Sequence, residues 1–137
     1  MNQKKAKWLI YTVMVGLIPI VSRLFAWFLT SKGIVKIFSA SDFVAFGLIL
    51  HISNINEIEN VQSLDPTWRT IQNGISIVFI CFYSVLYAFN LISEGSPIVK
   101  SSVLTGCSAL LSLVSFVLSY TVYDRLSKMS RVKGITK

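Results

Sequence analysis

The sequence contains few of the residues from which active sites and metal centres are usually built. It has one histidine, His51, and two cysteines, Cys81 and Cys107, so the sequence has no zinc-finger spacing, and no Ser/His/Asp or Cys/His arrangement can be named. It also lacks a glycine-rich phosphate-binding loop. Because catalysis needs several convergent polar groups, we expect no catalytic residues, no bound metal and no cofactor.

Charged residues are scarce as well. They make up 14% of the 137 residues, whereas soluble domains carry about 25%. The hydrophobic share is 53% and the mean hydropathy is +0.65. A chain this apolar cannot hide its surface in a soluble core. These values predict an all-α integral membrane protein with one membrane domain over residues 1–137.

The positive charges gather at the two ends of the chain, within a net charge of +7. One cluster is Lys4, Lys5 and Lys7, and the other consists of Arg125, Lys128, Arg131, Lys133 and Lys137. Positive residues flanking membrane spans stay on the cytoplasmic side, so both termini are predicted to be cytoplasmic. Nucleic-acid binding would need a basic face on a folded soluble domain, so we expect no direct nucleic-acid contact.

Four segments are predicted to be transmembrane helices. Their ranges are about 8–30, 33–52, 67–92 and 97–123, with a cytoplasmic loop at 53–66 and a basic cytoplasmic tail at 124–137. The second span is short in its apolar centre and contains Lys36, Asp42 and His51. It is included because three spans would put one basic terminus outside, whereas four leave both inside. The first segment is long for a signal peptide and is expected to remain as a span.

Turn and cap residues support these boundaries. Asp65-Pro66 is typical of a helix start, with Asp65 as the N-cap and Pro66 at the first helical position. Gly95 and Pro97 indicate a helix end and a new start within a short outer loop. The sequence Ser31-Lys32-Gly33 predicts the other tight outer turn.

The last span carries a stripe of small hydroxyl residues on one helical face. Spacings of four and three residues align Ser101, Thr105, Ser108, Ser112, Ser115 and Ser119. Small polar residues let membrane helices pack closely and form hydrogen bonds, which favours a packing face. A wet path across the membrane is the alternative interpretation. Narrow faces are also expected in the first span, at Thr12, Gly16, Pro19, Arg23 and Ala26, and in the third, at Gly74, Ile77, Cys81, Ser84 and Ala88. These faces build either one compact bundle or an oligomer of such bundles.

Two charged residues are predicted at similar depth in neighbouring spans. Arg23 lies seven positions before the end of the first span, and Asp42 lies nine positions after Gly33. At about 1.5 Å per residue, Arg23 is about 10 Å below the outer boundary. Charges at membrane depth usually face the interior and find a partner, which predicts an Arg23–Asp42 ion pair. The alternative is that Arg23 reaches up to the outer headgroups and Asp42 stays near the surface.

The segment from His51 to Asp65 is the largest predicted cytoplasmic feature apart from the tail. Apolar residues recur in it at every third position, and we interpret it as a helical extension of the second span. It is acidic where the rest of the cytoplasmic face is basic. We therefore expect a cytoplasmic partner to dock on Ile55, Glu57, Ile58 and Glu59.

The layout of four spans with two tight outer turns, Ser31-Lys32-Gly33 and Gly95-Ser96-Pro97, is also informative. It resembles membrane subunits of bacterial anti-phage defence systems, of the Kiwa membrane subunit type, and small immunity proteins against pore-forming toxins. The resemblance implies an oligomer in the bacterial inner membrane bound to a cytoplasmic effector. Any enzymatic step would then belong to the partner.

Two functions are compatible with these features. The first is a non-catalytic inner-membrane subunit that anchors or senses and signals to a cytoplasmic protein partner. The alternative is an oligomeric channel or pore-forming protein, or a toxin-immunity protein, whose path is lined by the stripe or by the Arg23 face. Membrane lipid and further copies of the chain are expected partners in both cases. The first is preferred because the stripe carries no charge.

Overall fold

A computed structural model describes residues 3–62 and 64–135, and the regular structure within these ranges is entirely helical, as predicted. The elements are α1 (Gln3–Trp8), the π-helix η1 (Leu9–Met14), α2 (Val15–Leu29), α3 (Ala40–Glu59), α4 (Pro66–Gly95) and α5 (Ser101–Ile135). Residues 136–137 of the predicted tail lie outside the described ranges, as do the side chains of Lys4, Lys5, Arg131 and Lys133.

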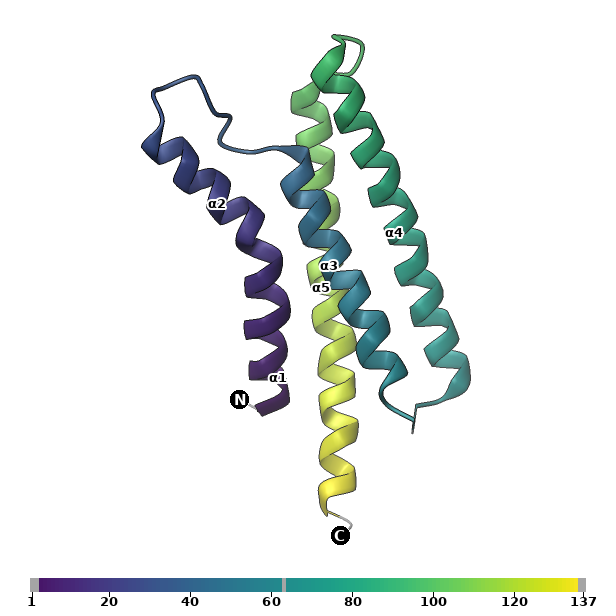
Figure 1. Cartoon of the computed structure of the whole chain (residues 1–137). Helices are drawn as coiled ribbons and strands as arrows, with labels where there is room; N and C mark the ends of the chain where they lie inside the picture. Colours follow the sequence, from purple (N-terminus) through teal and green to yellow (C-terminus); the bar gives the residue numbers. More distant parts are fainter. Residues whose placement is uncertain (1–2, 63, 136–137) are drawn as a thin grey trace.

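The first three elements form one continuous rod, because Trp8 and Met14 at the two junctions keep α-helical backbone angles. Pro19 lies inside α2. It has no backbone N–H to donate, and its ring crowds the preceding turn, so it kinks the helix. Figure 1 shows the rod bending so that the far end of α2 leans away from α3.

The helix α3 lies in the middle of the bundle and packs against α2, α4 and α5. It starts at Ala40 and not at Gly33 as predicted, because residues 30–39 form an irregular connection. Gly33 has a φ angle of 95°, which favours glycine and is incompatible with a helix start there. The expected tight turn is therefore the first part of a longer loop. At its other end α3 continues helically to Glu59.

The helices α4 and α5 form a hairpin. The Asp65 carboxylate accepts a hydrogen bond from the Trp68 backbone N–H at 3.1 Å, and Pro66 occupies the first turn, so the predicted N-cap is confirmed. Residues 96–100 connect the two helices, and α5 starts at Ser101 and not at Pro97. It continues as a helix through most of the predicted tail and extends beyond the other helices (Figure 1).

The bundle has two distinct ends (Figure 1). The start of α1, the α3–α4 loop and the end of α5 lie together, and we call this the terminal end. The loops at 30–39 and 96–100 lie at the opposite end, which we call the hairpin end.

Two clusters of buried side chains hold the half of the bundle nearer the terminal end. One consists of Trp8, Phe46, Leu50 and Tyr123, and the other of Ile58, Leu64, Val122 and Leu126. The N-terminal rod packs closely against the first cluster: a Cβ on Gly16 would come within 2.7 Å of the Phe46 ring. Glycine at this position thus allows η1 and α2 to approach α3 closely.

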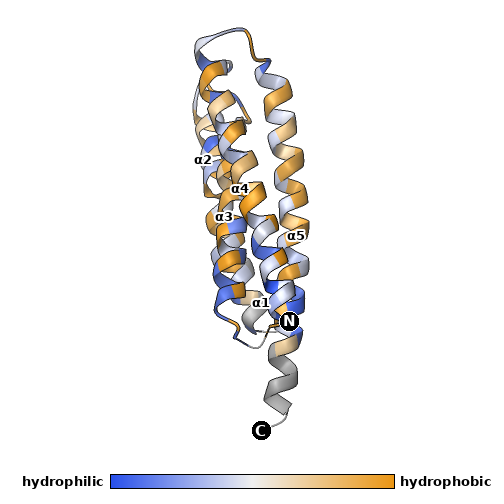
Figure 2. Cartoon of the chain, turned by 90° about the vertical axis from the view of Figure 1, so that its right-hand side faces the viewer, coloured by the Kyte–Doolittle hydropathy of each residue, from blue (hydrophilic) through white to orange (hydrophobic). Residues whose placement is uncertain are grey.

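Large apolar side chains cover the outside of the bundle. Figure 2 shows hydrophobic residues along the helices and more hydrophilic ones toward the terminal end. Within the described residues, three helical segments are long and apolar enough to cross a membrane: Ala6–Leu29, Pro66–Gly95 and Ser101–Met129. The predicted second span is not among them, because Asp42, His51 and Asn54 lower the hydropathy of α3. These polar residues are buried between the other helices.

Candidate functional site

The buried faces of α3 and α5 form a polar seam along the middle of the bundle. From α3 come His51 and Asn54, which are 1% and 3% exposed. From α5 come Ser108, Ser112, Ser115 and Ser119, all buried. The other two members of the predicted stripe, Ser101 and Thr105, are half-buried near the hairpin end. In this single chain, the stripe therefore packs mainly on a neighbouring helix, and its central part is not exposed.

The centre of the seam is a hydrogen-bonded group from three helices. The Ser115 Oγ atom lies 2.9 Å from His51 Nε2 and 2.8 Å from the Tyr83 hydroxyl. The His51 ring also stacks on Phe79, with 4.6 Å between ring centroids. Ser115 thus links α3, α4 and α5 at one point. Tyr83 reaches this point because Gly47 leaves room for its ring, which a Cβ there would overlap.

Two further hydrogen bonds extend the seam toward the terminal end. Asn54 Nδ2 donates to Ser119 Oγ at 2.9 Å, joining α3 to α5. Thr12 and Ser53 share a hydrogen bond of 3.0 Å between their hydroxyls, joining η1 to α3. Glu59 of α3 also accepts hydrogen bonds from Arg69 and Asn73 of α4, so every helical rod is linked to α3 by side-chain hydrogen bonds. In a membrane, such bonds fix which helix faces meet, because apolar burial alone does not distinguish them.

The seam is incompletely satisfied. Ser112 donates to the Ala109 carbonyl of its own helix at 2.8 Å. The Ser108 hydroxyl and the Nδ1 atom of His51 are buried and have no hydrogen-bond partner among the described residues. Leaving a buried polar atom unpaired costs about 1–3 kcal/mol. The seam is therefore less stable locally than a fully paired network of the same size.

Arg23 and Asp42 form an ion pair between α2 and α3 near the hairpin end. The Arg23 Nε donates to one carboxylate oxygen, and its Nη2 donates to the other at 3.3 Å, so the contact is two-pronged. The side chains are 29% and 11% exposed. Arg23 also lines a cavity of about 450 Å³ together with Lys36, Asn90, Glu94 and Ser101. Arg23 and Asp42 therefore face each other, as in the first of the two arrangements considered from the sequence.

The four residues expected to dock a partner, Ile55, Glu57, Ile58 and Glu59, differ in burial and in the contacts they make within the chain. Ile58 is fully buried, because it lies in the core with Leu64. Glu59 is engaged within the chain, accepting from Arg69 Nη2 at 2.7 Å and from Asn73 Nδ2 at 2.6 Å. Ile55 is half-buried, and Glu57 lines a pocket beside α1. In this conformation these four residues do not form one continuous docking surface.

The expected small face of the first span points into the bundle, since Gly16 is buried and Thr12, Pro19, Arg23 and Ala26 are half-buried. The small face predicted in the third span does not pack within the single chain. Gly74, Ile77, Cys81, Ser84 and Ala88 are all exposed, whereas Ser76, Tyr83 and Asn90 face the bundle. Tyr83 lies against Gly47 of α3 and is hydrogen-bonded to Ser115 of α5, so the side of α4 that carries it faces the bundle.

The Ser115–His51 contact was missed by the sequence analysis, although a signal for it exists. Gly47, His51 and Asn54 recur at helical spacing and align along one face of α3, opposite the serine stripe. A serine nucleophile needs a base that a third group orients. Here His51 Nδ1 has no partner among the described residues, and Ser115 is fully buried. The geometry supports a packing role for this pair.

No group of three histidine, cysteine or acidic side chains suited to a metal ion occurs in the part of the chain that the structure describes. Comparisons with protein-family models, with curated proteins and with solved structures find no match to this chain. The functional argument therefore depends on the geometry alone.

Proposed function

We propose that the chain is a non-catalytic membrane subunit that anchors a soluble partner, or reports a membrane signal to it, from the terminal end of the bundle. The observation that carries the proposal is the length of α5. This helix continues to Ile135, past the ends of α3 and α4, and extends away from the apolar part of the bundle (Figure 1). A helix that extends out of a membrane bundle offers a binding surface in water.

The last part of α5, from Arg125 to Ile135, is basic. It contains Arg125, Lys128, Arg131 and Lys133. Two of these residues are described in the structure: Arg125 lies over the Trp68 ring at 4.6 Å, and Lys128 pairs with Asp124 at 2.6 Å. Lys128 keeps 76% of its side chain exposed. The partner that fits this helix is a protein with an acidic surface.

The proposal includes four crossings and a cytoplasmic terminal end. The helix α3 has 20 residues, which is about 30 Å at 1.5 Å per residue and matches the hydrocarbon core. Its polar residues are shielded by α2, α4 and α5, so low hydropathy does not prevent it from crossing. The excess of lysine and arginine at the terminal end favours a cytoplasmic location in a bacterial inner membrane.

The proposal also includes self-association through α4. Its exposed face presents Gly74, Cys81, Ser84 and Ala88 to the surroundings. Small residues on an exposed membrane helix allow a second helix to approach closely. A signal in the membrane would then reach the partner through several copies of α5 held side by side.

The resemblance in layout to anti-phage membrane subunits suggests one class of partner, a cytoplasmic defence effector. Its test is phage plating on cells that express the chain together with its genomic neighbours. Protection that disappears when α5 is truncated after Met129 would support this assignment. Protection that is independent of the chain would remove it.

The main experiment is affinity purification in mild detergent at native expression, with mass spectrometry and particle mass. We expect a soluble protein in fixed stoichiometry. Its recovery should be lost in the double variant Arg125→Glu/Lys128→Glu and retained in the control Lys32→Glu/Lys100→Glu, which reverses two charges at the hairpin end. Equal recovery from both variants would contradict the role of α5. A homo-oligomer alone would instead direct attention to conductance and the channel alternative.

A further inference from the structure

A pocket of about 400 Å³ opens at the terminal end between α1, η1, α3 and α5, and its wall includes Lys7, Trp8, Tyr11 and Glu57. Sites for small molecules in proteins have volumes of about 300–1,000 Å³ and combine apolar walls with a few polar groups. The pocket has this composition. It shares Thr12 with the end of the polar seam, but it includes neither the His51–Ser115 group nor the Arg23–Asp42 pair.

The wall of the pocket is built on an uncommon backbone. Tyr11 and Thr12 belong to the π-helix η1. Such helices are rare and occur frequently at functional sites. The hydrogen bond of 3.0 Å between Thr12 and Ser53 fixes this wall against α3.

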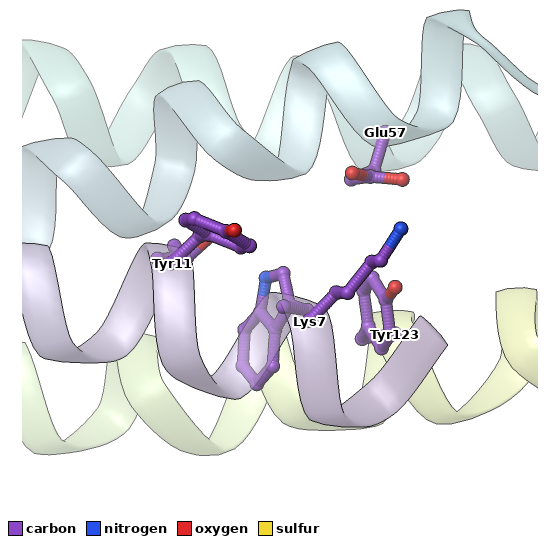
Figure 3. Close-up of a pocket in the computed structure, with 6 residues that line it drawn as sticks. Lys7, Tyr11, Glu57 and Tyr123 are labelled. Carbon is purple, nitrogen blue, oxygen red and sulfur yellow. The ribbon is translucent and has the colours of Figure 1, made fainter. Parts of the chain in front are cut away.

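Three polar groups of the pocket have no partner within the described chain. The Trp8 side chain is 4% exposed, and its indole Nε1 is buried without an acceptor. Neither Lys7 nor Glu57 forms an ion pair with a described residue. Figure 3 shows the Lys7 ammonium group directed toward Glu57 from the opposite side of the pocket. A buried N–H left unpaired costs about 1–3 kcal/mol, which a ligand acceptor would offset.

These groups define the charge pattern of the ligand. Lys7 and the Trp8 N–H are donors that suit an anionic oxygen, and Glu57 is an acceptor that suits an ammonium group. The aromatic rings of Tyr11 and Tyr123 add surfaces that attract a cation. A molecule that carries a phosphate and a primary amine a few atoms apart complements both sides.

We propose that this pocket binds the headgroup of an amino-phospholipid of the phosphatidylethanolamine type, with its phosphate on Lys7 and Trp8 and its ammonium on Glu57. A lipid is preferred over a soluble amino-phosphate because apolar neighbours on η1 are exposed next to the pocket. Ile10 and Met14 are 53% and 62% exposed and are placed to contact acyl chains. Tryptophan and tyrosine also concentrate at the headgroup level of membranes. The inference needs the chain to be in a membrane, but it does not depend on a soluble partner.

The test is native mass spectrometry of the full-length protein in mild detergent. Equal amounts of phosphatidylethanolamine, phosphatidylcholine and phosphatidylglycerol are offered, and retained lipid is counted. We expect phosphatidylethanolamine to be retained about tenfold better than phosphatidylcholine, whose methylated amine cannot donate a hydrogen bond to Glu57. Soluble glycerophosphoethanolamine is offered in a parallel sample. If it binds as tightly as the lipid, the ligand is a soluble amino-phosphate and the lipid assignment is wrong.

Variants separate the two halves of the site. Glu57→Gln should remove the preference for phosphatidylethanolamine over phosphatidylcholine, while the control Glu94→Gln, at the hairpin end, keeps it. Trp8→Phe retains the ring that stacks on Tyr123 at 4.9 Å but lacks the N–H, so it should weaken all three lipids alike. Equal retention of the three lipids by the unmodified chain would overturn the proposal. So would an unchanged preference in Glu57→Gln.

Discussion

His51 and Ser115 are 64 positions apart in the chain, and the Nε2 atom of one lies 2.9 Å from the Oγ atom of the other. The contact joins α3, which is not among the three segments long and apolar enough by themselves to cross a membrane, to the serine stripe of α5. It explains why an otherwise apolar helix carries hydroxyls along one side. The stripe provides hydrogen-bonding groups and close packing for a polar helix that lipid would not accommodate.

The first prediction contrasts two buried serines of the stripe. Ser115→Ala removes hydrogen bonds to His51 and Tyr83 and should lower the free energy of unfolding by about 1–2 kcal/mol. Ser108→Ala removes a hydroxyl that has no partner among the described residues, so it should be neutral or stabilising. Unfolding is followed by circular dichroism during titration from mild detergent into dodecyl sulfate. Equal losses in both variants would contradict the contact geometry.

The second prediction concerns the space that Gly47 leaves for Tyr83. Gly47→Ala places a methyl group inside the Tyr83 ring and should destabilise the bundle by about 1–3 kcal/mol. The matched control is Gly74→Ala on the exposed face of α4, where nothing lies within 4 Å. That change should stabilise by about 0.5–1 kcal/mol, because alanine is the better helix former. The same unfolding titration measures both, and a tolerated Gly47→Ala would refute close approach of α3 and α4.

The third prediction concerns the ion pair. Asp42→Asn leaves the Arg23 charge without its partner and should cost about 3 kcal/mol. The double variant Arg23→Leu/Asp42→Leu removes both charges and should recover much of that loss. An exposed pair provides the control, since Lys128→Gln breaks the contact with Asp124 and should cost less than about 1 kcal/mol. A double variant as unstable as Asp42→Asn would show that the charges act independently.

Much of the architecture was predictable from the sequence because it follows from local chemistry. Apolar length predicted the first, third and fourth rods, and Asp65-Pro66 predicted the start of α4. The start of α3 was not predictable in the same way. Lys36 and Asp42 do not distinguish a helix from a loop, and the sequence between Gly33 and Ala40 has no capping signal as clear as Asp65-Pro66.

The site was harder to predict than the fold, because its members come from different helices. The serine spacing indicated a packing face, but it did not identify the helix that packs there. Tyr83 enters the seam only because Gly47 faces it. The small residues Gly74 and Ser84 predicted a narrow face on α4, but not whether that face packs within the chain or between copies, whereas the buried face carries Tyr83, which is hydrogen-bonded to Ser115.

A fourth prediction tests whether the stripe is dry. In a chain whose exposed Cys81 and Cys107 are replaced by alanine, Ser112→Cys and Ser115→Cys should resist a water-soluble thiol reagent, because both positions are buried against α3. Ser102→Cys, on the exposed side of the same helix, should react. Rapid reaction at both buried positions would indicate a water-filled path and would favour the channel alternative.

The most direct test of the central claim is whether α3 crosses the membrane. In the same cysteine-free background, Lys32→Cys marks the loop before α3 and Gln62→Cys marks the loop after it, and both positions are exposed. A membrane-impermeant thiol reagent is applied to intact cells and to inverted vesicles. The account predicts that Lys32→Cys reacts only in cells and Gln62→Cys only in inverted vesicles. Reaction of both positions from the same side would mean that α3 does not cross, and would contradict the account.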